Sequence, residues 1–260
     1  MGRTWKAAFA CAAISVAATG CSTTQAGRGF GPVFTTVSGL AAQATKAGSD
    51  ITSVRGTLRV KSGPLDQTST FSEQLSRGRV TAFDDRISTI YQGNTTPLHL
   101  IIVDGKVYVD RSGQGGKPWV IATRDSSDPV VANLAENVDG TLDQAGMHGY
   151  VLMVSVGQDL RLVGPDTVGG VPCVRYHLSV DARVAAQRLT GPQAEQMQQA
   201  VDAGVDTIPL DVWVDATGRT VRVTDHVTAG AQSATVDLRL NHFNEPMSID
   251  APPPDQIAPR

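Results

Sequence analysis

The chain has 260 residues, enough for a single all-β or α+β domain, and its formal net charge is −3 at pH 7. A mildly acidic chain without a Lys/Arg cluster lacks the electrostatic surface that nucleic acid requires, so the sequence excludes nucleic acid as a partner. Aromatic residues make up only 5% of the sequence, so an inward face must be built largely from Val, Leu and Ile.

Residues 1–20 are organised like a secretory signal peptide. Arg3 and Lys6 give a short positive region, and residues 7–18 form an apolar run that only Ser15 interrupts. This run is well short of the roughly 20 residues that a helix needs to cross a membrane, but its length suits a signal peptide. Removal of the signal takes away two positive charges and changes the net charge from −3 to −5.

The end of this segment, Ala18-Thr19-Gly20-Cys21, resembles a bacterial lipobox, in which the Cys receives a diacylglyceryl thioether and becomes the new N-terminus. Ala18 stands where Leu or another aliphatic residue is commoner, and the alternative is an ordinary signal peptide with an incidental Cys. The polar, Gly-bearing stretch that follows is typical of a tether. We therefore predict a signal peptide over 1–20, a lipidated tether over 21–31, and attachment through palmitate-type acyl chains on Cys21 to the outer face of the cell membrane.

Residues 32–250 are predicted to form one domain, followed by a C-terminal tail over 251–260. Apolar residues from Val33 to Ala44 recur at helical spacing after Pro32, which predicts a first helix. Alternating apolar and polar residues then predict strands that end in a hairpin, because Asp104-Gly105 suits the positive φ angles of a type I′ turn. These strands are Val54–Lys61, Thr68–Leu75, Val80–Gln92, Leu98–Val103 and Lys106–Val109.

Two further helices are predicted in the second half of the domain. Asp128-Pro129 supplies a suitable N-cap and first residue for a helix over Val130–Leu142. We expect this helix to pack against the sheet, and a mobile cover over a cavity is the alternative. A weaker pattern predicts a helix over Ala194–Val201, after Gly191-Pro192, whereas Met147–Val156 fits either a helix or a strand.

Period-two alternation is clearest in the remaining strands, where Gly169-Gly170 and Ala216-Thr217-Gly218 provide the turns. Such alternation predicts one buried and one solvated face, and Trp213 and Asp215 fall on the solvated face. We therefore predict an α+β fold with a large antiparallel sheet of about ten strands and helices against one face. The later strands are Leu160–Val168, Val171–Val180, Leu210–Asp215, Arg219–Val227 and Val236–Asn241.

The three cysteines allow no internal disulfide. Cys11 lies in the signal and Cys21 carries the anchor, which leaves Cys173 alone. Cys173 lies among strand residues and is predicted to be a small buried apolar group, with a catalytic or intermolecular role as the alternative.

The sequence contains neither a Gly-x-Ser-x-Gly elbow nor a His-Glu-x-x-His pair. Asp84-Asp85, and Asp125 with Asp128, are predicted to be turn and cap residues rather than paired catalytic carboxylates. Gly113–Lys117 resembles a phosphate-binding loop only superficially, since Pro118 follows the Lys, and it is predicted to be a flexible hairpin tip. We predict no enzyme, no metal and no cofactor, because the five histidines are scattered singly: His99, His148, His177, His226 and His242.

Several segments taken together resemble the actinobacterial LppX/LprA/LprF/LprG lipoproteins, whose fold is similar to that of the LolA/LolB carriers. The resemblance implies a curved antiparallel half-barrel with helices on its concave face, enclosing an apolar cavity for the acyl chains of envelope lipids. The ordered set covers nearly the whole mature chain. These segments are the lipobox, Val103–Val109, Gly164–Pro172 leading to Tyr176, Leu210–Asp215 and Ala251–Asp255.

This resemblance implies an envelope lipoprotein that carries an acylated lipid, glycolipid or lipoglycan, with an envelope transporter as a further partner. The alternative is an envelope interaction or scaffold lipoprotein with a packed core. The inward-facing strand residues are first of all core residues and, on the resemblance, candidates to line the cavity. The candidates are Leu58, Val60, Phe71, Ile87, Val107, Val109, Val174, Tyr176, Leu178, Leu210, Val212, Val214, Val236, Leu238 and Leu240.

Overall fold

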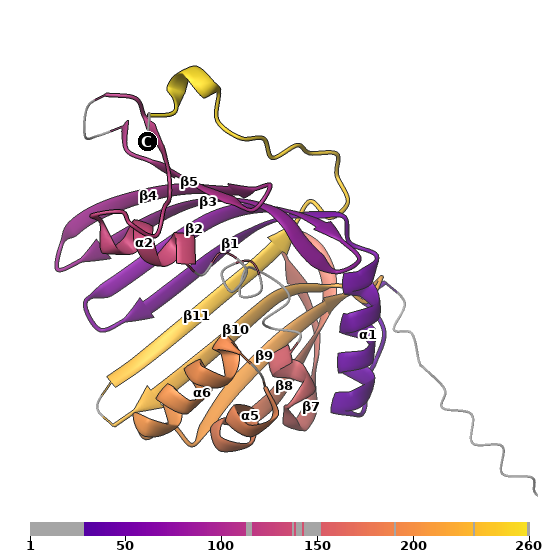
Figure 1. The fold of residues 1–260 in the computed structure, drawn as a ribbon. Coiled ribbons are helices and arrows are strands. Elements are labelled where there is room, and N and C mark those ends of the chain that lie inside the picture. The colour runs from indigo at the N-terminus through magenta and orange to yellow at the C-terminus, as the bar shows by residue number, and fades with distance from the viewer. Residues whose placement is uncertain are drawn as a thin grey trace, which may run out of the picture.

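The computed structural model describes residues 29–112, 116–136, 138, 142, 152–189, 191–230 and 232–258. Within these ranges the chain forms one antiparallel sheet of 11 strands with a few helices, which confirms the predicted α+β fold (Figure 1). The strands are β1 Ser53–Ser62, β2 Leu65–Ser76, β3 Arg79–Tyr91, β4 Asn94–Val103, β5 Lys106–Asp110, β6 Trp119–Ile121, β7 Gln158–Val168, β8 Val171–Asp181, β9 Thr207–Asp215, β10 Thr220–Ala229 and β11 Gln232–Asn241. The helices are α1 Val37–Ser49, α2 Pro129–Glu136, α5 Ala182–Arg188, α6 Pro192–Asp202 and the 3-10 helix Pro254–Gln256.

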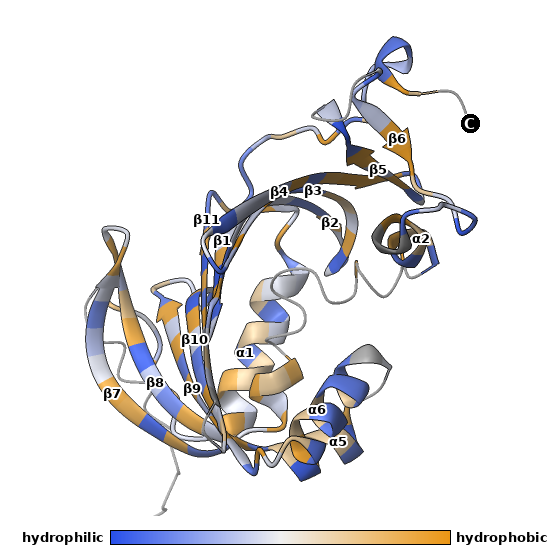
Figure 2. Cartoon of the chain, turned by 90° about the vertical axis from the view of Figure 1, so that its left-hand side faces the viewer, coloured by the Kyte–Doolittle hydropathy of each residue, from blue (hydrophilic) through white to orange (hydrophobic). Residues whose placement is uncertain are grey.

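The sheet consists of two halves that meet at its centre. Its strand order is β6-β5-β4-β3-β2-β1-β11-β10-β9-β8-β7, so the first and last strands of the chain pair with each other. In Figure 1 the early half is indigo to magenta and the late half is orange to yellow. Figure 2 shows that the sheet is strongly curved and that α1, α2, α5 and α6 all lie on its concave side. The predicted half-barrel is therefore confirmed.

The predicted hairpin turns are present. Asp104 and Gly105 have φ angles of 52° and 68° between β4 and β5, as a type I′ turn requires. Gly169 and Gly170 have φ angles of 56° and 83° between β7 and β8. In both hairpins the residues on either side of the turn are directly paired, so the turn sets the register of the strands.

Helix α1 starts later than the sequence pattern predicted. It begins at Val37 rather than at Val33, so the prediction was wrong at this end. Val33 and Phe34 fit the helical spacing, but the Tyr176 hydroxyl holds their segment outside the helix. This hydroxyl accepts from the Phe34 N–H at 3.1 Å and donates to the Pro32 carbonyl at 2.7 Å. A long-range contact therefore overrides the local pattern.

Side-chain caps fix the starts of α1 and α5. The Thr36 Oγ1 accepts from the Gly39 N–H at 3.1 Å and so caps α1. Helix α5 was not predicted, although the chain carries a helix-start signal there. The Asp181 side chain accepts from the Val184 N–H at 2.9 Å, which caps α5 directly at the end of β8.

Helix α2 begins at Pro129, the predicted first helical residue after the Asp128 cap. The Asp128 side chain accepts from the Val131 N–H at 3.4 Å, as expected of the predicted cap. Val131 is buried in the main core, and α2 contacts β5. The expectation that this helix packs against the sheet is therefore confirmed.

The convex face is less solvated than the alternation predicted. Trp213 is only 3% exposed, because the guanidinium groups of Arg175 and Arg222 lie 5.0 and 4.6 Å from the centre of its ring. Its indole N–H donates to Asp166 at 2.7 Å, and this hydrogen bond lowers the pKa of the Asp166 carboxyl. Cys173 lies buried in the same cluster, as predicted, and burial raises the pKa of its thiol to about 11.

Asp215 was also expected to be solvated, but it is 2% exposed. Its carboxylate accepts from the Thr217 and Arg219 backbone N–H groups at 2.8 and 2.9 Å, and from the Arg219 side chain at 2.9 Å. The side chain therefore closes the turn between β9 and β10, which alternation along a strand does not reveal.

The C-terminal segment covers one edge of the sheet. Ile257 forms a parallel bridge with Trp119 of β6, and the Ala258 N–H donates to the Trp119 carbonyl at 2.7 Å. Upstream of this bridge, Ile249 is buried against Ile101 and Tyr108 on the convex face. The edge of the early half is therefore paired within the chain.

Several predictions fall wholly or partly outside the described residues. They are the signal peptide, Cys21, most of the tether, residues 113–115 of the hairpin tip, and most of the helix after Glu136. Of the ambiguous segment Met147–Val156, only the end is described, and residues 152–155 are helical.

Candidate functional site

The predicted cavity residues all lie on the concave face, because the strand register places them in common cross-strand rows. They differ in burial, which the sequence did not reveal. Leu58, Val60, Ile87 and Val236 are only half-buried. The others are buried: Phe71, Val107, Val109, Val174, Tyr176, Leu178, Leu210, Val212, Val214, Leu238 and Leu240.

Burial on the concave face decreases toward one end of the central strands. The innermost row consists of Val54, Glu73, Phe83, Ile102 and Val107. A row nearer the strand ends consists of Leu238, Leu58, Ser69, Ile87 and Leu98. The rim row, beside the β1–β2, β3–β4 and β10–β11 turns, consists of Asp225, Val236, Val60, Gln67, Thr89 and Thr96. The apolar surface available to a ligand therefore lies at this end, where Leu98 joins the predicted residues.

The described helices make few contacts with the sheet, and the helix–strand pairs with the most contacts lie toward its two flanks. Helix α1 contacts β7, α5 contacts β8, and α2 contacts β5. The strands β11, β1, β2 and β3 lie between these flanks. Of the half-buried apolar residues, Leu58, Val60, Ile87 and Val236 belong to these central strands, and Leu98 lies on the adjoining β4.

Besides the rim residues Gln67, Thr89 and Thr96, four polar side chains lie on the concave face that the sequence analysis did not identify as site residues: Ser69, Glu73, Asp85 and Asp225. Asp85 was predicted to be a turn residue, but it lies within β3, and the Ser69 hydroxyl donates to it. The prediction was wrong because Asp84-Asp85 occupies the middle of a long strand, with one carboxylate on each face. The sequence did carry a signal for Glu73. Because side chains alternate along a strand, Glu73 shares one face of β2 with Phe71 and Leu75.

Burial dominates the electrostatics of these carboxyls. Burial, the larger cause, and the charge of Asp85 together raise the pKa of Glu73 to about 8. Burial likewise raises the pKa of Asp85 to about 6, although the Ser69 hydrogen bond opposes this change. The pKa of Asp225 is raised to about 7, again by burial. At pH 7 Glu73 is therefore mostly protonated and Asp225 about half protonated, whereas Asp85 is mostly ionised.

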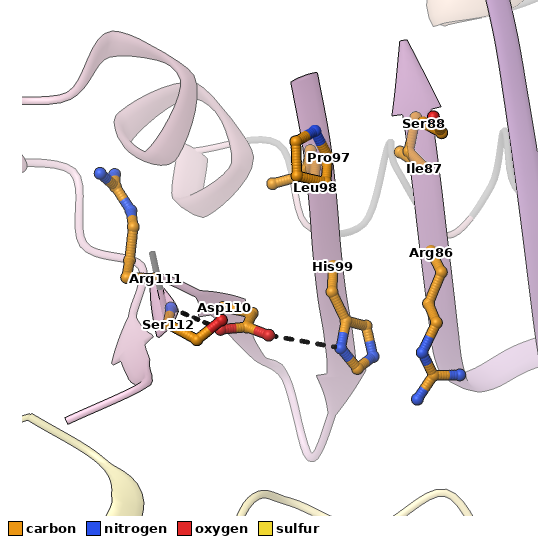
Figure 3. A pocket seen from close by; sticks show the side chains of 9 residues that line it. All are labelled: Arg86, Ile87, Ser88, Pro97, Leu98, His99, Asp110, Arg111 and Ser112. Carbon is orange, nitrogen blue, oxygen red and sulfur yellow. Dashed lines mark hydrogen bonds and ion pairs between the residues drawn. The ribbon is translucent and has the colours of Figure 1, made fainter. Parts of the chain in front are cut away.

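A pocket of about 590 Å³ lies beside this surface, at the edge of β4 beyond the end of β5 (Figure 3). The half-buried Ile87 and Leu98 line it together with polar residues. His99 is held on the opposite face of β4, 3.0 Å from Asp84 and 3.9 Å from Asp110. The pocket is therefore lined on one side by apolar side chains of the concave face and on the other by polar side chains at the edge of the sheet.

A second pocket, of about 540 Å³, lies where β6 approaches the start of α2. Val120 and Val131 contribute apolar surface, and Lys117 and Arg111 contribute charge. Arg111 is ion-paired with Asp128 at 2.6 Å, so the N-cap of α2 is tied to the end of β5.

Neither a metal site nor a membrane span is found in the described part of the chain. Its His, Cys, Asp and Glu residues include no group of three that could hold a metal ion. None of its helices has both the length and the apolar character needed to cross a membrane.

Two mycobacterial proteins of known structure share this architecture. LprF from Mycobacterium bovis matches with a TM-score of 0.51 and 14% identity, over 83% of this chain and 96% of its own. The lipoprotein LppX from Mycobacterium tuberculosis matches with a TM-score of 0.51 and 12% identity, over 82% of this chain and 99% of its own. The chain has the LprF/LppX fold. The fold that the sequence resemblance implied is therefore confirmed.

No protein-family model and no curated protein matches the sequence. At identities this low the structural likeness establishes the fold alone, because one fold supports many functions.

Proposed function

We propose that the protein is a lipid-anchored envelope lipoprotein that binds an acylated lipid, glycolipid or lipoglycan and carries it between the membrane and the outer envelope. The observation that carries this proposal is the half-buried apolar surface of Leu58, Val60, Ile87, Leu98 and Val236, on the concave side of the sheet. An enzymatic role has no support in the residues of this surface, and no cofactor is proposed.

The energetics of such a surface suit acyl chains. A chain that buries about 300 Å² of apolar area gains about 7 kcal/mol, at about 25 cal/mol per Å². Each additional methylene adds only about 0.8 kcal/mol, so this surface would accept chains of different lengths. Selectivity has to come from polar groups next to the apolar rows.

The entry of the tether into the fold supports an anchored function. The backbone at Gly31 approaches β9 so closely that an added Cβ would lie 2.6 Å from the Asp215 carbonyl oxygen. The Tyr176 hydroxyl fixes the next residue, Pro32. The tether segment from Ser22 to Gly31 spans about 35 Å when extended and about 18 Å when relaxed. A lipid on Cys21 would therefore keep the concave face within tens of Å of the membrane.

The proposal is tested with the chain from residue 22 onward, since the described structure begins at Gly29 and this truncation removes none of its contacts. The protein is incubated with dipalmitoyl phosphatidylglycerol and examined by native mass spectrometry. Leu58→Trp places a large ring on the concave face, whereas Thr57→Trp places it on the exposed side of the same strand. We expect the wild type and Thr57→Trp to bind lipid and Leu58→Trp to lose binding.

A second function is favoured by the burial of most predicted cavity residues. In that case the protein is an envelope interaction or scaffold lipoprotein with a packed core. The wild type, Thr57→Trp and Leu58→Trp would then all fail to bind an acylated ligand. Leu58→Trp would also lower the free energy of unfolding by about 1–3 kcal/mol, because the ring would overpack the core.

A further inference from the structure

A strip of polar side chains crosses the apolar concave face. We define the acidic strip as Ser69 and Glu73 of β2 together with Asp85 of β3. Phe71 pairs directly with Asp85, so Glu73 and Ser69 are the two diagonal neighbours of Asp85 on the same face. Ser69 is 3%, Glu73 0% and Asp85 7% exposed.

Glu73 lies in the most apolar surroundings. Its direct cross-strand neighbours are Val54 and Phe83, and Phe71 and Leu75 flank it along the strand. All four neighbours belong to the main hydrophobic core. Within the described part of the chain, neither carboxyl oxygen of Glu73 has a hydrogen-bond partner. Burying a polar group without a hydrogen-bond partner is costly. The Glu73 carboxyl therefore has hydrogen-bonding capacity that no described residue of the fold uses.

The strip leads from the accessible end of the sheet to this carboxyl. Ser69 pairs with the half-buried Leu58 on one side and the half-buried Ile87 on the other. Moving inward along the same face, Asp85 comes next and Glu73 lies in the innermost row. A chain entering over Leu58 and Ile87 would therefore meet Ser69, Asp85 and Glu73 in turn.

We propose that the acidic strip binds a hydrogen-bond-donating group, a hydroxyl or an ammonium, on an amphiphile whose chain lies over the neighbouring apolar rows. This inference rests on the proposed function and names the chemical class of its ligand. Carboxyl oxygens accept hydrogen bonds from both groups. An ammonium would also donate a charge-assisted hydrogen bond to ionised Asp85, whereas a carboxylate or phosphate would be repelled by it.

The expected discrimination can be measured with four probes of equal chain length: dodecanol, dodecylamine, methyl dodecanoate and dodecanoate. Methyl dodecanoate presents the same chain without a donor, and titration at about pH 9, above the Glu73 pKa of about 8, prevents that carboxyl from donating to the ester carbonyl. Binding is measured by isothermal titration calorimetry to the chain from residue 22 onward. We expect the alcohol, the amine or both to bind about tenfold more tightly than the ester, as one retained hydrogen bond implies. If dodecanol binds more tightly than the ester, the donor is a hydroxyl. If dodecylamine does, the donor is an ammonium.

Glu73→Leu should bring the alcohol to the affinity of the ester while the ester still binds, and should weaken binding of the amine, which keeps Asp85 as a partner. Glu73→Gln should keep the preference for the alcohol, since an amide still accepts a hydrogen bond. Glu195→Gln, on the exposed face of α6, is the control and should behave like the wild type. Urea unfolding of each variant confirms that it is folded.

Equal affinity of the wild type for the donors and the ester would overturn this inference and leave the proposed function intact. A preference for the alcohol or the amine that is as strong in Glu73→Leu as in the wild type would also overturn the inference and leave the proposed function intact. If the wild type binds none of the four probes, the proposed function fails and this inference fails with it.

Discussion

Glu73→Gln should reduce the pH dependence of stability. An acid whose pKa is raised on folding binds its proton more tightly in the folded than in the unfolded chain. The free energy of unfolding therefore falls as the pH rises from the ordinary pKa of 4.5 to the folded value of about 8. Glutamine does not titrate, so the variant loses this contribution.

The magnitude follows from the two pKa values. Each pH unit between them costs about 1.4 kcal/mol, so the Glu73 contribution should change by about 3 kcal/mol from about pH 5 to about pH 7.5. Asp85 and Asp225 change stability in the same direction, because their pKa values are also raised. They are present in both proteins, and the difference between the two pH profiles isolates Glu73.

Urea unfolding at several pH values measures this difference without ligand. Glu195→Gln removes an exposed carboxylate from α6 and serves as the matched control, with an unchanged pH profile expected. If Glu73→Gln and the wild type lose stability equally over this range, Glu73 ionises freely in the folded protein. The reasoning from its burial would then be refuted.

Three further substitutions test the fold. Tyr176→Phe removes both hydrogen bonds to residues 32–34 and should cost about 1–2 kcal/mol in urea unfolding; an unchanged midpoint would mean that the hydroxyl does not fix the tether. Gly56→Ala should cost about 1–3 kcal/mol by thermal denaturation, because its Cβ would overlap the Phe71 ring; no loss would show that the ring moves aside freely. Asp215→Ala should cost about 3 kcal/mol and speed amide exchange at Thr217 and Arg219, and unchanged exchange would contradict its role in closing the turn.

The strands were predictable because each hairpin combines two local signals. Alternation marked the strand faces, and turns such as Asp104-Gly105 marked their ends with residues that accept positive φ angles. The start of α1 was not predictable in this way. Val33 and Phe34 fit the helical pattern, but a hydroxyl on β8, far away in the sequence, holds the segment in another conformation.

The candidate site was predictable only in its apolar part. Alternation identified the concave face, but it could not separate buried Val212 from half-buried Val60, because burial depends on which helix covers which strand. Glu73 and Asp85 went unrecognised for a related reason, since a carboxylate in a strand is ordinarily solvated. Trp213 shows the converse error, where two arginines bury a side chain that alternation places outside.

The bridge between Ile257 and Trp119 has a consequence for the integrity of the protein. An unpaired edge strand is a template on which other chains can add strands, and natural sheets protect such edges. Here the protection of β6 comes from a terminal segment, the part of a chain that proteases remove most easily. Trimming after Asp250 would leave the domain nearly whole but expose the β6 edge. Proteolysis at the C-terminus would then make the protein prone to aggregation without touching its concave face.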